Sequence, residues 1–156
     1  MQLSQADLIV STLGTDPQVI SAAKGLVAAE QNFNPFVVDV PSICSDPTLP
    51  TTAALRGVVP LVDPSVGGAS TENANSATSL TTAFSADGLS VAQVMVNAGF
   101  SNFTTKAVDG TVGTASGASS SSNSTAASSV SSAASTPAAV VAVAASSACG
   151  GTTLVT

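Results

Sequence analysis

The chain has 156 residues, a net charge of −6 and no histidine. Its nine acidic residues outnumber Lys24, Arg56 and Lys106, and this balance argues against a nucleic-acid partner and against an anionic membrane surface. Without an imidazole, the Ser-His-Asp and Cys-His mechanisms are excluded, together with zinc sites built on His. Trp and Tyr are also missing, so Val, Leu, Ile and Ala must supply most of the core.

A short helix is expected at the start of the chain. Ser4 can cap this helix, which runs to about Thr12 and ends at Gly14. Leu3 and Leu8 have the spacing of a hydrophobic staple, in which the residue before the cap packs on the first turn. The pattern therefore predicts that these two leucines lie together.

The second predicted helix, residues 17–31, has the clearest pattern in the chain. Asp16 can cap this helix, and Pro17 suits its first position. Apolar residues recur on one face at a spacing of 3.6, whereas Ser21 and Lys24 face outward. The apolar positions are Val19, Ile20, Ala23, Leu26 and Val27.

Two short extended segments are expected in the middle of the chain, at residues 36–40 and 58–62. Pro60 has no backbone N–H, so the second segment must lie at a sheet edge or outside a sheet. Between them, residues 51–56 can form one or two helical turns that end at Gly57.

A last helix of the N-terminal part is well defined by its ends. Ser90 and Gln93 have the spacing of a capping box, and Leu89 and Val94 that of a hydrophobic staple. Gly99 is placed to end the helix. Its predicted buried face consists of Val91, Val94, Met95 and Ala98.

After Asp109 the last 47 residues carry no charged side chain. This boundary predicts a small, mainly α-helical domain at residues 1–109, followed by a low-complexity disordered tail. Residues 110–136 are expected to be a linker or stalk. Fifteen of the 27 residues at 111–137 are Ser or Thr, so few large apolar groups offset the entropy of ordering the backbone.

The final segment, residues 137–156, is expected to contain a short apolar helix and a C-terminal tail. Thr136 can cap the helix, Pro137 can take its first position, and Gly150 can end it. Its apolar run, residues 138–145, is about half of the ~20 residues that a transmembrane helix needs, so no transmembrane segment is expected. A helix this short is marginal alone and would have to dock.

Two features favour an extracellular or cell-wall location. N-glycosylation sequons occur at Asn102 and Asn123, with Thr104 and Thr125 as their hydroxyl residues. The Ser/Thr-rich tract has the composition of an O-glycosylated stalk. The first seven residues have no basic region and no apolar stretch, so no signal peptide is visible. Removal of a leader would reconcile these observations, and an intracellular protein with an unmodified linker is the alternative.

The two cysteines, Cys44 and Cys149, lie on opposite sides of the Ser-rich tract. In an extracellular protein they could form a disulfide that folds the C-terminus back onto the domain. A loop near 100 residues contributes roughly 4–5 kcal/mol in the chain-entropy model. Two unrelated thiols, one buried and one exposed, are the alternative.

A resemblance points the same way. Residues 72–78 (Glu-Asn-Ala-Asn-Ser-Ala-Thr), 85–91 (Ser-Ala-Asp-Gly-Leu-Ser-Val) and 99–104 (Gly-Phe-Ser-Asn-Phe-Thr) precede a Ser/Ala-rich tail. Over residues 30–137 this style resembles that of small secreted or cell-surface proteins of filamentous fungi. The resemblance contains no catalytic motif, and it implies an extracellular, glycosylated protein.

Two kinds of catalytic residue can be considered. Ser21 and Lys24 match the S-x-x-K pattern, but its accompanying Ser-Asp-Asn and Lys-Thr-Gly elements are missing, which favours a solvated helix face. Two nearby carboxylates would suffice for glycoside hydrolysis. The acidic residues expected in loops or at edges are Asp39, Asp46, Asp63, Glu72 and Asp87, and they show neither a cofactor motif nor a metal-ligand spacing.

The sequence therefore favours a non-catalytic, secreted or cell-wall-associated surface glycoprotein with no cofactor, whose partners would be wall or surface components. A carrier of a lipid or another small apolar molecule is one alternative, and a carboxylate-dependent hydrolase of unrecognised type is another. The carrier would bind its ligand in an apolar groove. Side chains that otherwise form the core would line this groove: Phe33, Phe36, Phe84, Met95, Phe100 and Phe103.

Overall fold

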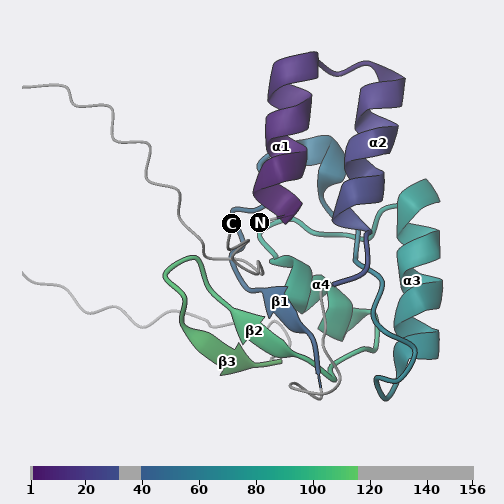
Figure 1. The fold of residues 1–156 in the computed structure, drawn as a ribbon, viewed down its shortest axis with the longest axis vertical. Helices are drawn as coiled ribbons and strands as arrows, with labels where there is room; N and C mark the ends of the chain where they lie inside the picture. Colours follow the sequence, from purple (N-terminus) through teal and green to yellow (C-terminus); the bar gives the residue numbers. More distant parts are fainter. Residues whose placement is uncertain (1, 32–39, 116–156) are drawn as a thin grey trace, which may run out of the picture.

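The computed structural model describes residues 2–31 and 40–115 (Figure 1). Four α-helices and a small three-stranded sheet make up most of the regular structure of this part of the chain, so the expected helices are present in a mixed fold rather than a mainly helical one. The elements in order are α1 (Gln2–Leu13), α2 (Pro17–Val27), β1 (Ser42–Cys44), the 3₁₀ helix η1 (Ala53–Leu55), α3 (Ala69–Thr81), α4 (Val91–Asn97), β2 (Thr104–Lys106) and β3 (Val112–Thr114). No helix among these is long and apolar enough to cross a membrane.

The three strands lie in the order β1-β2-β3. β1 and β2 are parallel, with Cys44 opposite Lys106, whereas β2 and β3 are antiparallel, with Thr104 opposite Thr114. Parallel pairing needs a long crossover, and η1, α3 and α4 lie within the one that joins β1 to β2. Helix α4 packs against β1, while the α1–α2 hairpin projects from the opposite end of the molecule (Figure 1).

The sheet continues past the charge boundary at Asp109. The Asp109 carboxylate accepts a hydrogen bond from the Thr111 N–H over 2.9 Å, and Gly110 has a φ of +89°, which glycine adopts without strain. This turn reverses the chain so that β3 pairs with β2. The first residues of the predicted linker thus belong to the folded part, whereas residues 116–156, with the predicted helix at 137–148, lie outside the described residues.

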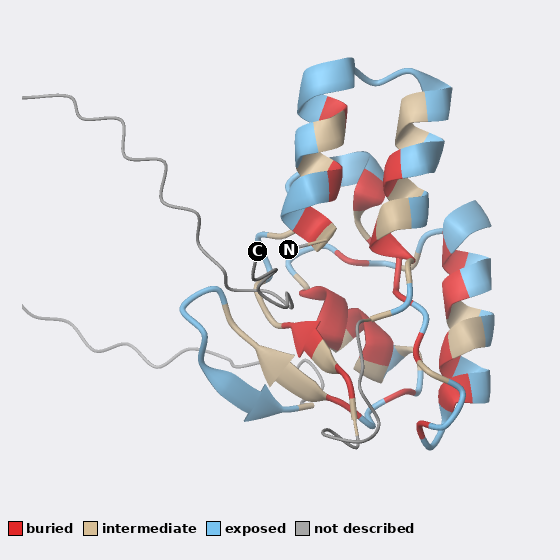
Figure 2. Cartoon of the chain, in the orientation of Figure 1, coloured by how far each residue is buried: buried red, intermediate tan, exposed pale blue. Residues whose placement is uncertain are grey.

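Helices α1 and α2 pack against each other, and their buried residues lie on the sides that face each other (Figure 2). The predicted staple on α1 is wrong, because Leu3 is buried while Leu8 is 63% exposed. The helix begins at Gln2, so Ser4 lies inside the first turn, and five positions place the two leucines about 140° apart around the axis. Gly14 ends the helix with a φ of +90°, as expected. The buried residues of the pair are Leu3, Ala6, Val10, Ala23 and Val27.

Helix α2 begins as predicted but ends early. The Asp16 carboxylate accepts a hydrogen bond from the Gln18 N–H over 2.9 Å, and a proline occupies the first turn. Beyond Ala28 the backbone pairs with Leu61 instead of continuing the helix. The Leu61 N–H donates to the Ala28 carbonyl over 3.0 Å, and the Gln31 N–H donates to the Leu61 carbonyl over 3.1 Å. These tertiary hydrogen bonds replace the last predicted helical turn.

Residues 58–62 form no strand, which is one of the two outcomes that Pro60 left open, and they cross the interior of the domain. Their polar backbone is satisfied by α3. The Val59 N–H donates to Ser79 Oγ over 3.1 Å, and the Val62 N–H donates to Asn73 Oδ1 over 2.9 Å. Helix α3 was not expected, because its sequence has no apolar stripe. It packs through these hydrogen bonds.

The ends of α4 agree with the sequence. Ser90 and Gln93 make the predicted capping box, and Gly99 follows the helix with a φ of +94°. The predicted buried face needs one correction, because Ala98 is half-buried at the C-cap. Most of this short helix is buried (Figure 2). Its buried residues are Val91, Ala92, Val94 and Met95.

Two charged side chains hold the loops through the backbone. The Asp7 carboxylate on α1 accepts hydrogen bonds from the N–H groups of Thr51 and Thr52, each over 2.8 Å. The Arg56 guanidinium, just after η1, donates to carbonyl oxygens at 2.8–3.0 Å. These carbonyls belong to Pro47, Pro50, Ala86 and Leu89.

Candidate functional site

The sequon at Asn102 lies on an exposed loop between α4 and β2. The aromatic rings on either side of it are buried: Phe100 and Phe103 stack with their centroids 5.7 Å apart. Asn102 therefore points outward from a loop that the core anchors at both ends. Its Nδ2 donates to the Gly67 carbonyl over 3.1 Å. An amide nitrogen has two hydrogens, so a glycan replacing one of them leaves the other for this bond.

The hydroxyl residue of this sequon, Thr104, begins β2 and is half-buried. Its Oγ1 donates to the Pro41 carbonyl over 3.3 Å. The sequon thus combines an exposed asparagine, the glycan acceptor, with a threonine that lies within the sheet. The second predicted acceptor, Asn123, lies outside the described residues.

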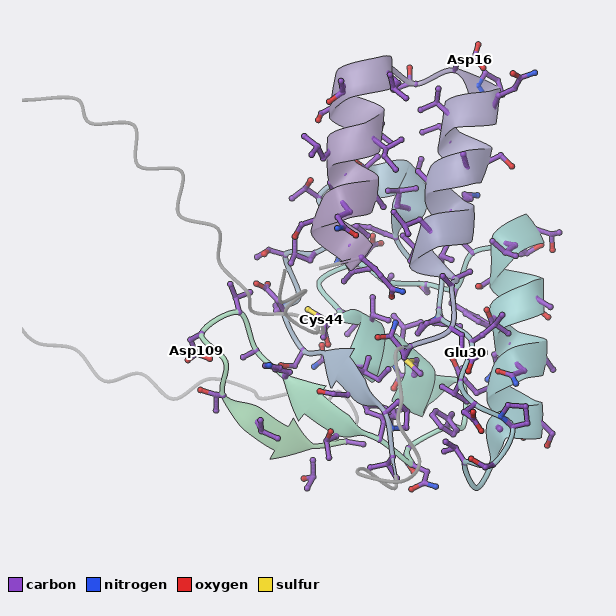
Figure 3. All side chains as sticks on the ribbon, in the orientation of Figure 1. Asp16, Glu30, Cys44 and Asp109 are labelled. Atoms are coloured by element: carbon purple, nitrogen blue, oxygen red, sulfur yellow. The ribbon has the colours of Figure 1, made fainter. Side chains whose placement is uncertain are left out.

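Cys44 ends β1, between the start of α1 and the sheet (Figure 3). Its side chain is buried, with 9% of its surface exposed, and it is not a free thiol. The predicted partner, Cys149, lies outside the described residues, so the pairing of the two stays a prediction.

A narrow hollow of about 20 Å³, partly open to solvent, lies beside Cys44 and has room for about one water molecule. Polar side chains border part of it: the Gln31 amide donates to Gln2 Oε1 over 2.6 Å, and Ser42 lies close by. The remaining lining residues are apolar, and the space suits a single water-sized, uncharged molecule. The apolar lining residues are Leu3, Val27, Ile43, Pro60 and Val91.

A second hollow, of about 200 Å³ and more open, is lined by six residues, four of which carry a hydroxyl. Two of its polar residues, Ser90 and Gln93, already bond each other in the cap of α4. Ala92 and the hydroxyl residues Ser45, Thr105 and Thr114 complete the lining. Neutral donors and acceptors of this kind suit a polar, uncharged group.

Two of the candidate carboxylates hold turns, in agreement with the loop positions expected for them. The Asp46 Oδ1 accepts from both the N–H and the hydroxyl of Thr48, and the Asp63 Oδ1 accepts from the same two groups of Ser65. The Ser65 hydroxyl, followed by its N–H, lowers the pKa of Asp63. Asp87 is exposed in a turn. Asp39 lies outside the described residues, within which no cluster of three metal-ligating side chains occurs.

Glu72 contradicts the prediction that it lies in a loop or at an edge. It is on α3 and fully buried, at 0% exposure, and neither carboxyl oxygen has a hydrogen-bond partner in the described part of the chain. Burial raises the pKa of Glu72 to about 8, and the nearby Asn75 side chain acts weakly in the opposite direction. The carboxyl is therefore mainly protonated and neutral at pH 7.

The sequence held a weak signal for this buried face. The buried polar residues of α3 are spaced four and three positions apart and follow the Gly67-Gly68 pair in the sequence: Glu72, Ser76 and Ser79. That is helical spacing, but the residues are polar, so a search for apolar periodicity passes over it.

The S-x-x-K pair lies on α2. Ser21 is exposed and Lys24 is half-buried, which places the hydroxyl on the solvated side of the helix. Among the aromatic candidates for an apolar groove, Phe100, Phe103 and Met95 are core residues, and Phe84 packs on that core. Phe33 and Phe36 lie outside the described residues.

Comparisons with protein-family models, with curated proteins and with solved structures each found no match to this chain.

Proposed function

We propose that this chain is a non-catalytic surface glycoprotein, secreted or associated with a cell wall, whose folded domain stands beside a glycosylated Ser/Thr-rich stalk. The observation that carries the proposal is the placement of Asn102. A sequon asparagine on an exposed loop, anchored by two buried phenylalanines, leaves a glycan free to extend into solvent without disturbing the core.

The state of Cys44 supports the same location. Structural disulfides persist in oxidising compartments, and Cys44 is not a free thiol. The partners of such a protein are wall or surface components. Uncharged, hydroxyl-rich surfaces such as the hollow at Ser45, Thr105 and Thr114 suit contacts with neutral polymers.

The test is the intact mass of the protein from its native source, compared with the 15.0 kDa of the unmodified chain. Glycan mass that an N-glycosidase removes, with conversion of Asn102 to Asp, supports the proposal. The matched variant is Asn102→Gln, which preserves the side-chain amide but cannot accept the glycan. An unmodified chain with two reduced thiols would overturn the proposal.

A further inference from the structure

We propose that the second hollow, between the start of α4 and the sheet, binds one sugar unit of a neutral carbohydrate chain. The hollow has a volume of about 200 Å³ and is partly open to solvent. The proposal rests on the proposed function, because it names the chemical class of the wall or surface partner. The lining residues are Ser45 just after β1, Ser90, Ala92 and Gln93 at the start of α4, Thr105 in β2 and Thr114 in β3.

One side of the hollow is formed by the sheet. Ile43 in β1, Thr105 in β2 and Gly113 in β3 lie opposite one another in register, so they share one face of the sheet. Ile43 is buried, whereas Thr105 is only half-buried. A Cβ atom on Gly113 would lie 2.8 Å from Thr105 Oγ1, so the glycine leaves room for this hydroxyl. The sheet thus presents a hydroxyl group at the hollow.

The polar groups of the lining have hydrogen-bonding capacity that the fold does not use. Within the described residues, the hydroxyls of Ser45, Thr105 and Thr114 make no hydrogen bond. Gln93 Oε1 accepts from the N–H and the hydroxyl of Ser90, over 2.9 and 3.2 Å, whereas Gln93 Nε2 makes no hydrogen bond in this part of the chain. A hydroxyl can donate one bond and accept two, and an amide nitrogen can donate two. A ligand with several hydroxyls can use all of these groups.

The charge of the site favours a neutral ligand. No charged residue belongs to the described lining of the hollow, and Lys106 follows Thr105 on the strand, so its side chain lies on the other face of the sheet. The net charge of −6 repels an anionic ligand, and no cation in this lining offsets the repulsion. A purely apolar ligand would instead bury hydroxyls without partners, which is unfavourable. The lining therefore selects a neutral, hydroxyl-rich ligand, which is the chemistry of an unmodified sugar.

The size of the hollow limits the ligand to one ring. At about 30 Å³ for each water molecule, about six waters fit in it. Complete pockets for small organic ligands measure about 300–1,000 Å³, so the other units of the chain would stay in solvent. None of the lining residues is aromatic, so no side chain stacks on the sugar ring. Binding should therefore be weak, in the millimolar range.

The first experiment compares two trisaccharides, one of glucose and one of galacturonic acid, which carries a carboxylate on each ring. Each is titrated into the full chain labelled with nitrogen-15, and NMR follows the amide signals. The neutral sugar should shift the amides of residues 45, 92–93, 105 and 114 in a saturable way, and the acidic sugar should bind at least about tenfold more weakly. Absence of saturable shifts at these amides, or equal binding of the two sugars, would overturn the proposal.

A neutral peptide is the competing ligand, because its backbone also supplies donors and acceptors. A hexapeptide of alternating glycine and serine is therefore titrated in the same way. Tighter binding of the glucose trisaccharide than of the peptide supports the carbohydrate assignment. Tighter binding of the peptide at the same amides would show a peptide site, and the proposal would be wrong.

The second experiment removes single hydroxyls. Thr105→Val keeps the branched shape of the side chain and should weaken binding of the glucose trisaccharide about five- to tenfold, whereas Thr105→Ser keeps the hydroxyl and should retain most of the affinity. Ser45→Ala should have an effect similar to that of Thr105→Val, and it lies outside the strands, so the test does not depend on the folding of a β2 variant. Thr82→Val makes the matched change at an exposed position after α3 and should leave binding unchanged.

Unchanged affinity in both Thr105→Val and Ser45→Ala would overturn the proposal. Glycan mass at Asn102 is measured on the protein from its native source, whereas the titrations report on the amides around the hollow. The proposed function and the sugar site can therefore fail independently of each other.

Discussion

Helices α1 and α2 meet through Leu3, Ala6 and Ala23. Helix α3 instead meets its neighbours through hydrogen bonds that Asn73 and Ser79 accept from backbone N–H groups. The first interface is apolar. The second covers a backbone segment, residues 58–62, that has no strand partner for its N–H groups. The comparison teaches that an extended segment can cross the core when a polar helix face supplies the hydrogen bonds that a sheet would otherwise provide.

The apolar interface should respond most strongly to a buried charge. Ala23→Asp places a carboxylate at a position with 0% exposure, and we expect it to lower the free energy of unfolding by at least about 4 kcal/mol. The measurement is urea unfolding followed by circular dichroism. Ser21→Asp adds the same charge on the exposed side of α2 and should change stability by less than about 0.5 kcal/mol. Equal effects of the two variants would show that α1 and α2 do not pack as described.

The contribution of the polar interface to stability should instead depend on pH. The pKa of Glu72 is raised from its ordinary 4.5 to about 8 in the folded state, so the folded protein holds a proton that the unfolded chain releases. The contribution of Glu72 to the free energy of unfolding is therefore greatest below about pH 4.5. It falls as the pH rises from about 4.5 to about 8 and is constant above that. The expected loss across this window is a few kcal/mol.

Glu72→Gln isolates this effect, since the amide cannot ionise. The variant should match the wild type near pH 5 and be more stable than it at pH 9, as measured by urea unfolding at both pH values. Glu30→Gln, at an exposed position, serves as the control and should preserve the pH dependence. A Glu72→Gln profile parallel to that of the wild type would contradict a neutral, buried carboxyl.

Removal of a single hydrogen bond from the polar interface should have a smaller effect. Ser79→Ala leaves the Val59 N–H without its acceptor in the core and is expected to cost about 1–3 kcal/mol. Thr81→Ala removes an exposed hydroxyl from the same helix and should change stability by less than about 0.5 kcal/mol. Thermal unfolding of the two variants would sharpen the comparison, and equal midpoints would argue against support of residues 58–62 by α3.

The smallest expected effect lies at the helix ends. Asp16→Ala removes the side-chain cap of α2 and should cost about 1 kcal/mol, whereas Asp16→Asn retains an acceptor and should cost less. The N-cap of α3 is Gly68, which has no side chain to cap the helix. If Asp16→Ala proved neutral in urea unfolding, the apolar packing of α2 alone would suffice to set its start.

Elements with explicit end signals were predictable. Asp16 and Pro17 mark the start of α2, and the Ser90–Gln93 box marks the start of α4, because caps satisfy local N–H groups and need no distant partner. The end of α2 could not be predicted, since it depends on hydrogen bonds to Leu61, 33 residues beyond Ala28 (61 − 28). The exposed position of Leu8 was missed for a local reason, a helix that begins earlier than its supposed cap.

The sequence by itself determined the acidic, histidine-free chemistry, the boundary at which charge ends, the sequon at Asn102 and the turns at Asp46 and Asp63. These properties depend on residue type or on hydrogen bonds between residues two or three positions apart. Only the tertiary structure decided that β3 extends the domain past Asp109 and that Glu72 is buried and neutral. Strand pairing and burial depend on segments far apart in the chain. A polar helix face has no apolar periodicity from which its burial in a core could be predicted.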